Sequence, residues 1–130
     1  MQDRPNIDEL LEAVAGFLTD DVMPNTQGRI NFHARVAGNV VQMLRRELAH
    51  QEEHIAIEWE GLDRLIGPAP RPATIAETRA AIDARNRDLC DRIRRGDADT
   101  GAYRAAVLAH VRKVTHDKLV VSNPGLAAEG

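Results

Sequence analysis

The sequence predicts an all-α protein, built as a bundle of four to five helices in a single domain over residues 1–130. Nineteen of the 130 residues are alanine, and alanine has the highest helix propensity because it loses no side-chain entropy in a helix. No segment alternates apolar and polar residues for long enough to indicate a half-buried strand. Amphipathic helices joined by short loops bury their apolar stripes against each other, which gives a bundle.

The first helix is expected to begin at Asn6 and to end at Pro24. Asn6 and Glu9 have the spacing of a capping box, in which each side chain accepts a hydrogen bond from the other residue's backbone amide. Apolar residues then recur on one face of this helix: Ile7, Leu10, Val14, Phe17 and Leu18.

A second helical pattern begins near residues 27–29. Its apolar stripe is wide, so we expect it to bury about half of the helix circumference. The stripe contains Ile30, His33, Val36, Ala37, Val40, Leu44 and Leu48, and is broadened by Phe32 and Met43.

The same stripe continues in phase through Ile55, Trp59, Leu62 and Ile66. Either one helix extends to Ile66, or the chain breaks near residues 50–53 and folds back. A single helix of this length would measure roughly 57 Å at 1.5 Å per residue, which is longer than the diameter of a small domain. The sequence therefore favours a break.

Residues 67–73 form a predicted loop, because three prolines at alternate positions are incompatible with a helix interior. Thr74 and Glu77 repeat the capping-box spacing and predict a helix that ends near Gly96. The last helix is expected over residues 102–121, and residues 124–130 are expected to form a frayed tail.

Composition excludes several classes of function. Aromatic residues make up 3% of the chain and the formal net charge is -3, which argues against a nucleic-acid partner. Cys90 is the only cysteine, so neither an intrachain disulfide nor a cysteine-rich zinc site can form. No apolar run is long enough to cross a membrane, and no secretory signal is recognisable. We expect a cytoplasmic protein that needs no cofactor.

The candidate ligand-binding residues are polar side chains within or beside the apolar stripes. His33 lies near the centre of the widest stripe, where it is either a hydrogen-bonded core histidine or a ligand-binding group. Asn86 and His110 also lie among apolar residues and could meet His33 in a polar network. Arg29 and Asn39 could bind a carboxylate or a phosphate, or could pair with neighbouring side chains.

A weak metal-binding pattern is present at His50 and His54, which have the His-x-x-Glu-His spacing of some zinc peptidases. Both histidines lie off the apolar stripe, and the short chain offers no clear third ligand. The sequence therefore predicts no metal site and no catalytic residue, and an enzyme is the less favoured class.

Five stretches of the chain resemble a family of small bacterial helical proteins that is known only as a domain of unknown function. The most specific stretch is residues 28–39, and the others are residues 1–5, 9–14, 46–48 and 118–124. Members of this family are often encoded beside aminoglycoside-phosphotransferase-like kinases and acyl-CoA dehydrogenases. The resemblance implies an accessory protein in acyl-CoA or small-molecule metabolism, and it supplies no catalytic residue.

The expected function is binding rather than chemistry, with a protein partner or a second copy of the chain. Apolar residues off the main stripes could form an exposed interface: Leu11, Val22, Leu108 and Leu119. The alternative is a small-molecule pocket in the bundle core around His33, possibly catalytic.

Overall fold

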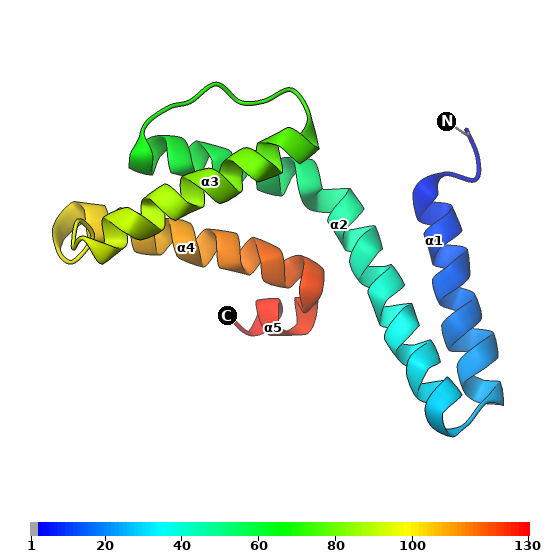
Figure 1. Ribbon diagram of the computed structural model, residues 1–130. Coiled ribbons are helices and arrows are strands. Elements are labelled where there is room, and N and C mark those ends of the chain that lie inside the picture. Colours follow the sequence, from blue (N-terminus) through cyan, green and yellow to red (C-terminus); the bar gives the residue numbers. More distant parts are fainter. Residues whose placement is uncertain (1–2) are drawn as a thin grey trace. The chain divides into compact units, whose positions relative to one another are not determined.

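The computed structural model describes residues 3–130 and contains five α-helices and no strand in that range, so the predicted all-α class is confirmed (Figure 1). Residues 1–2 of the expected domain lie outside the described residues. Contacts divide the chain into two compact units, unit 1 (Met1–Ala49) and unit 2 (His50–Gly130).

The chain begins with α1 (Ile7–Gly16), which continues as a π-helical segment, η1 (Phe17–Val22), and a short 3-10 turn, η2 (Met23–Asn25). The predicted capping box is confirmed, since Asn6 Oδ1 accepts from the Glu9 amide at 2.9 Å and Glu9 Oε2 accepts from the Asn6 amide at 2.8 Å. Pro24 lies in the 3-10 turn, where the helical segment ends as expected.

The next helix, α2 (Gly28–Ile66), is a single helix of 39 residues. The break expected near residues 50–53 is therefore wrong. That expectation assumed that the whole helix packs inside one compact body, whereas the boundary between the two units falls inside α2, between Ala49 and His50. A helix shared by two units is not limited by the diameter of either one, and no proline interrupts its hydrogen bonds.

In unit 1, α1 runs alongside the N-terminal part of α2 as an antiparallel hairpin (Figure 1). The buried positions within residues 3–49 are all small: Ala15, Ala34 and Gly38. A Cβ atom added at Gly38 would lie 3.2 Å from Thr19 Cγ2, so the missing side chain lets the helices approach closely. The helices therefore meet through small residues, and large side chains lie elsewhere.

An ion pair joins the open end of this hairpin. Arg45 Nε donates to Asp8 Oδ1 at 2.7 Å and Arg45 Nη2 donates to Asp8 Oδ2 at 2.9 Å. These hydrogen bonds lower the pKa of Asp8 and raise the pKa of Arg45. Because Asp8 is well exposed, the pair fixes the geometry more than it adds stability.

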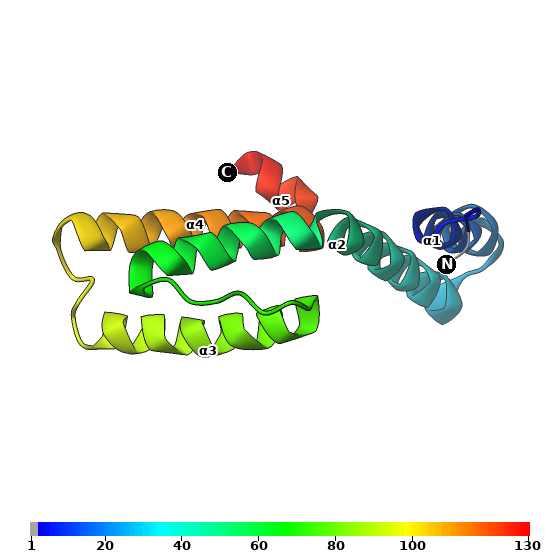
Figure 2. The same cartoon turned by 90° about the horizontal axis from the view of Figure 1, so that it is seen from above.

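Unit 2 combines the C-terminal part of α2 with α3 (Ile75–Arg94) and α4 (Gly101–Ser122), which run alongside it (Figures 1 and 2). The predicted capping box of Thr74 and Glu77 is confirmed at the start of α3. Large apolar side chains from all three helices form one buried core: Ile55, Trp59, Leu62, Leu65, Ile82, Leu89 and Val107.

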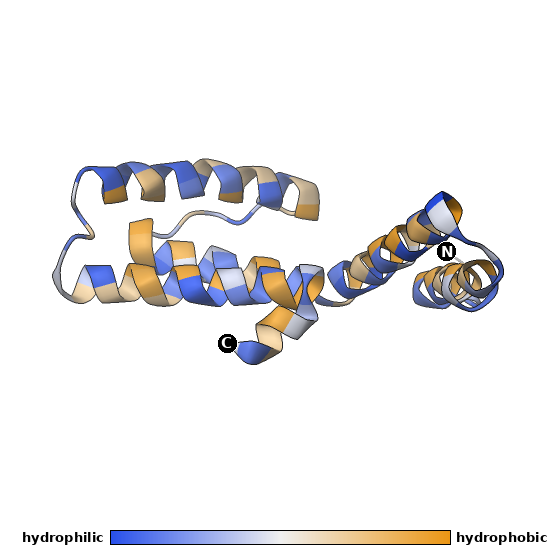
Figure 3. Ribbon diagram, turned by 90° about the horizontal axis from the view of Figure 1, so that it is seen from below, coloured by the Kyte–Doolittle hydropathy of each residue, from blue (hydrophilic) through white to orange (hydrophobic). Residues whose placement is uncertain are grey.

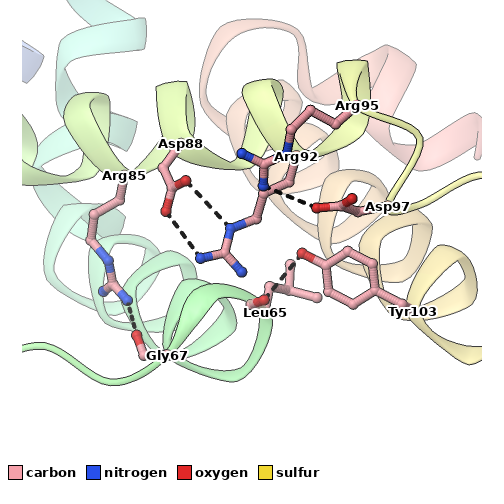
Figure 4. Close-up of polar contacts among 8 residues, drawn as sticks. All are labelled: Leu65, Gly67, Arg85, Asp88, Arg92, Arg95, Asp97 and Tyr103. Atoms are coloured by element: carbon pink, nitrogen blue, oxygen red, sulfur yellow. Dashed lines mark hydrogen bonds and ion pairs between the residues drawn. The ribbon is translucent and has the colours of Figure 1, made fainter.

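Polar contacts fasten the rim of this core (Figure 4). Arg85 Nη2 donates to the Gly67 carbonyl at 2.7 Å, and the Arg85 guanidinium stacks 4.5 Å from the ring centre of Trp59. The Tyr103 hydroxyl donates to the Leu65 carbonyl at 3.1 Å. The bond from Arg85 ties the first residue of the segment 67–73, which forms neither helix nor strand, to α3.

The C-terminal segment differs from the expected frayed tail, because it forms a further helix, α5 (Pro124–Glu129). Asn123 Oδ1 accepts from the Leu126 amide at 3.3 Å, and proline at the first helical position is favourable because it has no amide to satisfy. Ala127 is buried, so this short helix packs on the protein.

Candidate functional site

Unit 1 carries an exposed apolar face. Eleven large apolar side chains of the hairpin are between 37% and 64% exposed. The apolar stripe of residues 30–48 was expected to be buried. This expectation is wrong for the large apolar side chains of the stripe. We call this set the unit 1 face: Ile7, Leu10, Val14, Phe17, Ile30, Phe32, Val36, Val40, Met43, Leu44 and Leu48.

Helical spacing places most of this face on one side of the hairpin, and Phe32 and Met43 extend it around the outer side of α2. Viewed from its own N-terminus, each helix carries its apolar stripe on the same side, clockwise or anticlockwise, of the residues that touch the other helix. The two helices run antiparallel. The stripes of α1 and α2 therefore point to the same side. Ile7 and Leu48 line one shallow depression of about 390 Å³ together with Arg45, which agrees with this placement. Figure 3 shows hydrophobic residues along both helices.

The predicted residues Arg29, His33 and Asn39 are all exposed on the N-terminal part of α2. Arg29 Nε donates to His33 Nε2 at 3.4 Å, and the His33 ring packs edge-on against Phe32 with 5.6 Å between ring centres. The expectation that His33 is sunk among aliphatic core residues is wrong, because the helix turns its small residues inward and its apolar stripe outward.

The other two candidates, Asn86 and His110, are half-buried in unit 2. Arg29, His33 and Asn39 therefore belong to unit 1, whereas Asn86 and His110 belong to unit 2. Asn86 donates from Nδ2 to Glu58 Oε1 at 2.9 Å, and Lys118 Nζ lies 3.9 Å from the same oxygen.

His110 belongs to the same polar cluster, packed closely against the backbone at Gly61. Burial lowers the pKa of His110, and the positive charges of Arg64 and Lys118 lower it further while the Glu58 carboxylate opposes them. The carboxylate of Glu58 is thus occupied by an amide and an ammonium group. This arrangement is typical of a network that fixes helix packing.

The histidines of the weak metal pattern stack on each other, with 5.2 Å between the ring centres of His50 and His54. His54 Nε2 lies 4.0 Å from Oδ1 of the buried Asp117, which also pairs with Lys113. Within residues 3–130, no group of three or more histidine, cysteine, aspartate or glutamate side chains could hold a metal ion.

The exposed apolar surface lies elsewhere than the sequence indicated. Leu108 is exposed, but Leu11, Val22 and Leu119 are only partly so. The face was missed because its residues have the spacing of core residues. Its exposure could have been predicted from one feature of the sequence. The first 49 residues supply only two helical stretches, and two helices alone cannot bury both of their apolar stripes.

Comparison with known proteins gives a family and no function. A family model described as "Domain of unknown function (DUF6285)" matches residues 24–126. No curated protein matches the chain, and neither does any solved structure. In the range of residues that the structure describes, every helix is too short or too polar to cross a bilayer.

Proposed function

Because the chain belongs to the family described as Domain of unknown function (DUF6285), which carries no assigned activity, we propose a function from the geometry of this chain. The protein is a non-catalytic binding protein that holds another protein chain on the unit 1 face. The observation that carries this proposal is the exposure of eleven large apolar side chains on one hairpin.

The size of the face supports binding of a protein rather than a small molecule. Eleven half-exposed large side chains present on the order of 1,000 Å² of apolar surface, whereas the largest apolar patch on a typical monomer covers about 300–600 Å². A standard interface covers about 800 Å² on each partner. The unit 1 face is therefore as large as a stable protein interface requires.

The chemistry of the face also favours binding. Its eleven members offer no nucleophile, acid or base. Ionisable groups border them, since Arg35 lies 5.7 Å from the ring centre of Phe32 and Arg45 lines the depression shared by Ile7 and Leu48. The ion pair of Arg45 with Asp8 lies at the open end of the hairpin. An apolar centre with polar groups at its edge is the usual anatomy of a protein interface.

The resemblance to small bacterial proteins suggests where this protein acts and which class of partner it binds. The protein would act in the bacterial cytoplasm, without a nucleic-acid or membrane partner, as an accessory to a kinase-like or acyl-CoA-metabolising enzyme. This part rests on gene neighbourhood, which suggests a partner without giving a mechanism.

The contact of Arg29 with His33 favours a second candidate function, a small-molecule site at those two residues. Calorimetry with acetyl-CoA and with inorganic phosphate tests it. Binding that disappears in His33→Ala while the melting temperature stays constant would favour this candidate, and absence of heat with both probes would remove its support.

The main proposal is tested by measuring association with and without the face. Sedimentation velocity is measured on the protein alone and mixed with a purified kinase-like enzyme or acyl-CoA dehydrogenase encoded beside it. We expect a complex that Val40→Glu disrupts and Asn39→Glu preserves. Asn39 is exposed on the same helix one position earlier, so it is a matched control for the added charge.

If the protein neither self-associates nor binds either enzyme, the proposal is wrong. It is equally wrong if a complex forms and Val40→Glu leaves it unchanged. Circular dichroism of both variants shows whether the hairpin keeps its helices.

A further inference from the structure

We infer that the chain covering the unit 1 face is a second copy of this protein, so that two hairpins pack face to face as a four-helix assembly. This inference rests on the proposed function, which requires only that some protein chain binds the face.

The hairpin has no core of its own. Its buried positions within residues 3–49 are Ala15, Ala34 and Gly38, and none of these carries a large side chain. A two-helix layer buries its apolar side only against another layer. The fold of unit 1 is therefore half of a two-layer arrangement, and a second identical hairpin would supply the missing half.

A permanent cover is needed because the face is too large to stay in water. About 1,000 Å² of apolar surface left open would favour nonspecific association. The chain that covers the face must therefore be present in at least the same number of copies as this protein. A second copy always meets this condition, and two-fold dimers are the commonest oligomers.

The charges of the face permit contact with an identical face. Its eleven members are uncharged, and Asp8 and Glu12 pair with Arg45 on the same hairpin at 2.7 Å and 3.6 Å. His33 lies within the apolar stripe of α2 and accepts a hydrogen bond from Arg29 at Nε2, and the Arg35 guanidinium lies 5.7 Å from the ring centre of Phe32. The members of the face therefore bring no charge of their own to a contact between two copies, and Asp8 and Glu12 beside it are already paired with Arg45.

The area of the face agrees with a stable dimer. Two copies would together bury on the order of 2,000 Å² of apolar surface, which lies at the lower bound of obligate homodimers and above crystal-packing contacts. Each copy would contribute both of its hairpin helices, giving the core of a four-helix bundle.

Sedimentation equilibrium of the full chain tests the inference. We expect a mass twice the 14.4 kDa of one chain. We expect Val40→Glu to weaken the dimer by more than about tenfold, because two-fold symmetry places two carboxylates in one apolar interface. Asn39→Glu should keep the dimer. A mass of one chain at micromolar concentration would overturn the inference, and so would a dimer that Val40→Glu does not weaken.

Cysteine cross-linking tests the position of the contact independently. Cys90 is exposed in unit 2, so it is first replaced by serine. Single cysteines are then introduced as Val36→Cys, Val40→Cys and Leu44→Cys, with Asn39→Cys as the control. At least one position on the face should give a covalent dimer under mild oxidation, and Asn39→Cys should give less. Equal yields at all four positions would contradict the inference.

The outcomes separate this inference from the proposed function. A monomer that binds a kinase-like enzyme or an acyl-CoA dehydrogenase through Val40 would overturn the inference that a second copy covers the face, and it would support the binding function. A monomer that binds neither enzyme would overturn both. A dimer that depends on Val40 supports both.

Discussion

The two units of this protein use similar apolar patterns in opposite ways. In unit 2, large side chains of three helices form a closed core in which Leu62 is fully buried. In unit 1, the helices touch through Ala15, Ala34 and Gly38, and the large side chains point outward. A third helix makes the difference, since two helices leave one side of each stripe open. Unit 2 therefore has a closed core of its own, whereas the large apolar side chains of unit 1 stay exposed.

The largest effect is expected when one leucine of each unit is replaced by alanine and the losses in stability are compared. Leu62→Ala should destabilise the protein by about 2–5 kcal/mol at any protein concentration, because it leaves a cavity in a closed core. Leu44, which is 49% exposed in the single chain, should respond differently. Leu44→Ala should cost less than about 0.5 kcal/mol in dilute solution, and more as the dimer forms. Urea unfolding at two protein concentrations measures both variants. If the loss in free energy of unfolding depended equally on protein concentration for the two variants, the two units would not differ in the way described.

A smaller effect compares a glycine from each unit. A Cβ atom at Gly61 would overlap the His110 ring, so Gly61→Ala should cost about 1–3 kcal/mol through overpacking. At Gly38 only the methyl group of Thr19 must move slightly, and the gain in helix propensity offsets this cost. Gly38→Ala should therefore change stability by less than about 0.5 kcal/mol. Thermal unfolding measures both, and a loss at Gly38 as large as the loss at Gly61 would show that Thr19 cannot move to accept the added methyl group.

The polar cluster of unit 2 provides a third comparison. Asn86→Ala removes the hydrogen bond to Glu58 and should cost about 1–2 kcal/mol, because the half-buried carboxylate then loses its amide donor and Lys118 lies 3.9 Å away. Asn39→Ala changes an exposed amide in unit 1 and should be nearly neutral. Chemical denaturation compares the two variants. A neutral Asn86→Ala would show that the cluster contributes little to packing.

The smallest effect is a pH dependence of unit 2. Burial lowers the pKa of His110 below the value of about 6.5 that it has in an unfolded chain. The unfolded state then binds more protons, so this group's contribution to stability is complete above about pH 6.5 and is lost as the pH falls through the lower folded pKa. His110→Gln should flatten this dependence. Arg64, Glu58 and Lys118 face the ring, and NMR titration of His110 follows it directly.

The local features of the fold could be predicted from sequence because they depend on residues close together in the chain. The capping boxes of Asn6 with Glu9 and of Thr74 with Glu77 are of this kind. The continuity of α2 could not be predicted, because the length limit assumed one compact body. The helix at Pro124 was missed for another reason, since proline after Asn123 stops one helix and also starts the next.

The candidate site was harder to predict, since periodicity shows that a helix has an apolar face and not what covers it. His33 was expected inside the core because it lies in the widest stripe, yet the small residues Ala34 and Gly38 make the helix contact. The bond between Asn86 and Glu58 joins residues far apart in the chain, and no local pattern marks it. The arrangement of helices decided both outcomes.

Hydrogen–deuterium exchange over a range of protein concentrations tests the central claim most directly. Amides of α1 and of the N-terminal part of α2 should become more protected as the concentration rises, while those of α3 and α4 stay constant. The claim would be contradicted if α1 were as well protected at nanomolar concentration, where a dimer dissociates, as at high concentration.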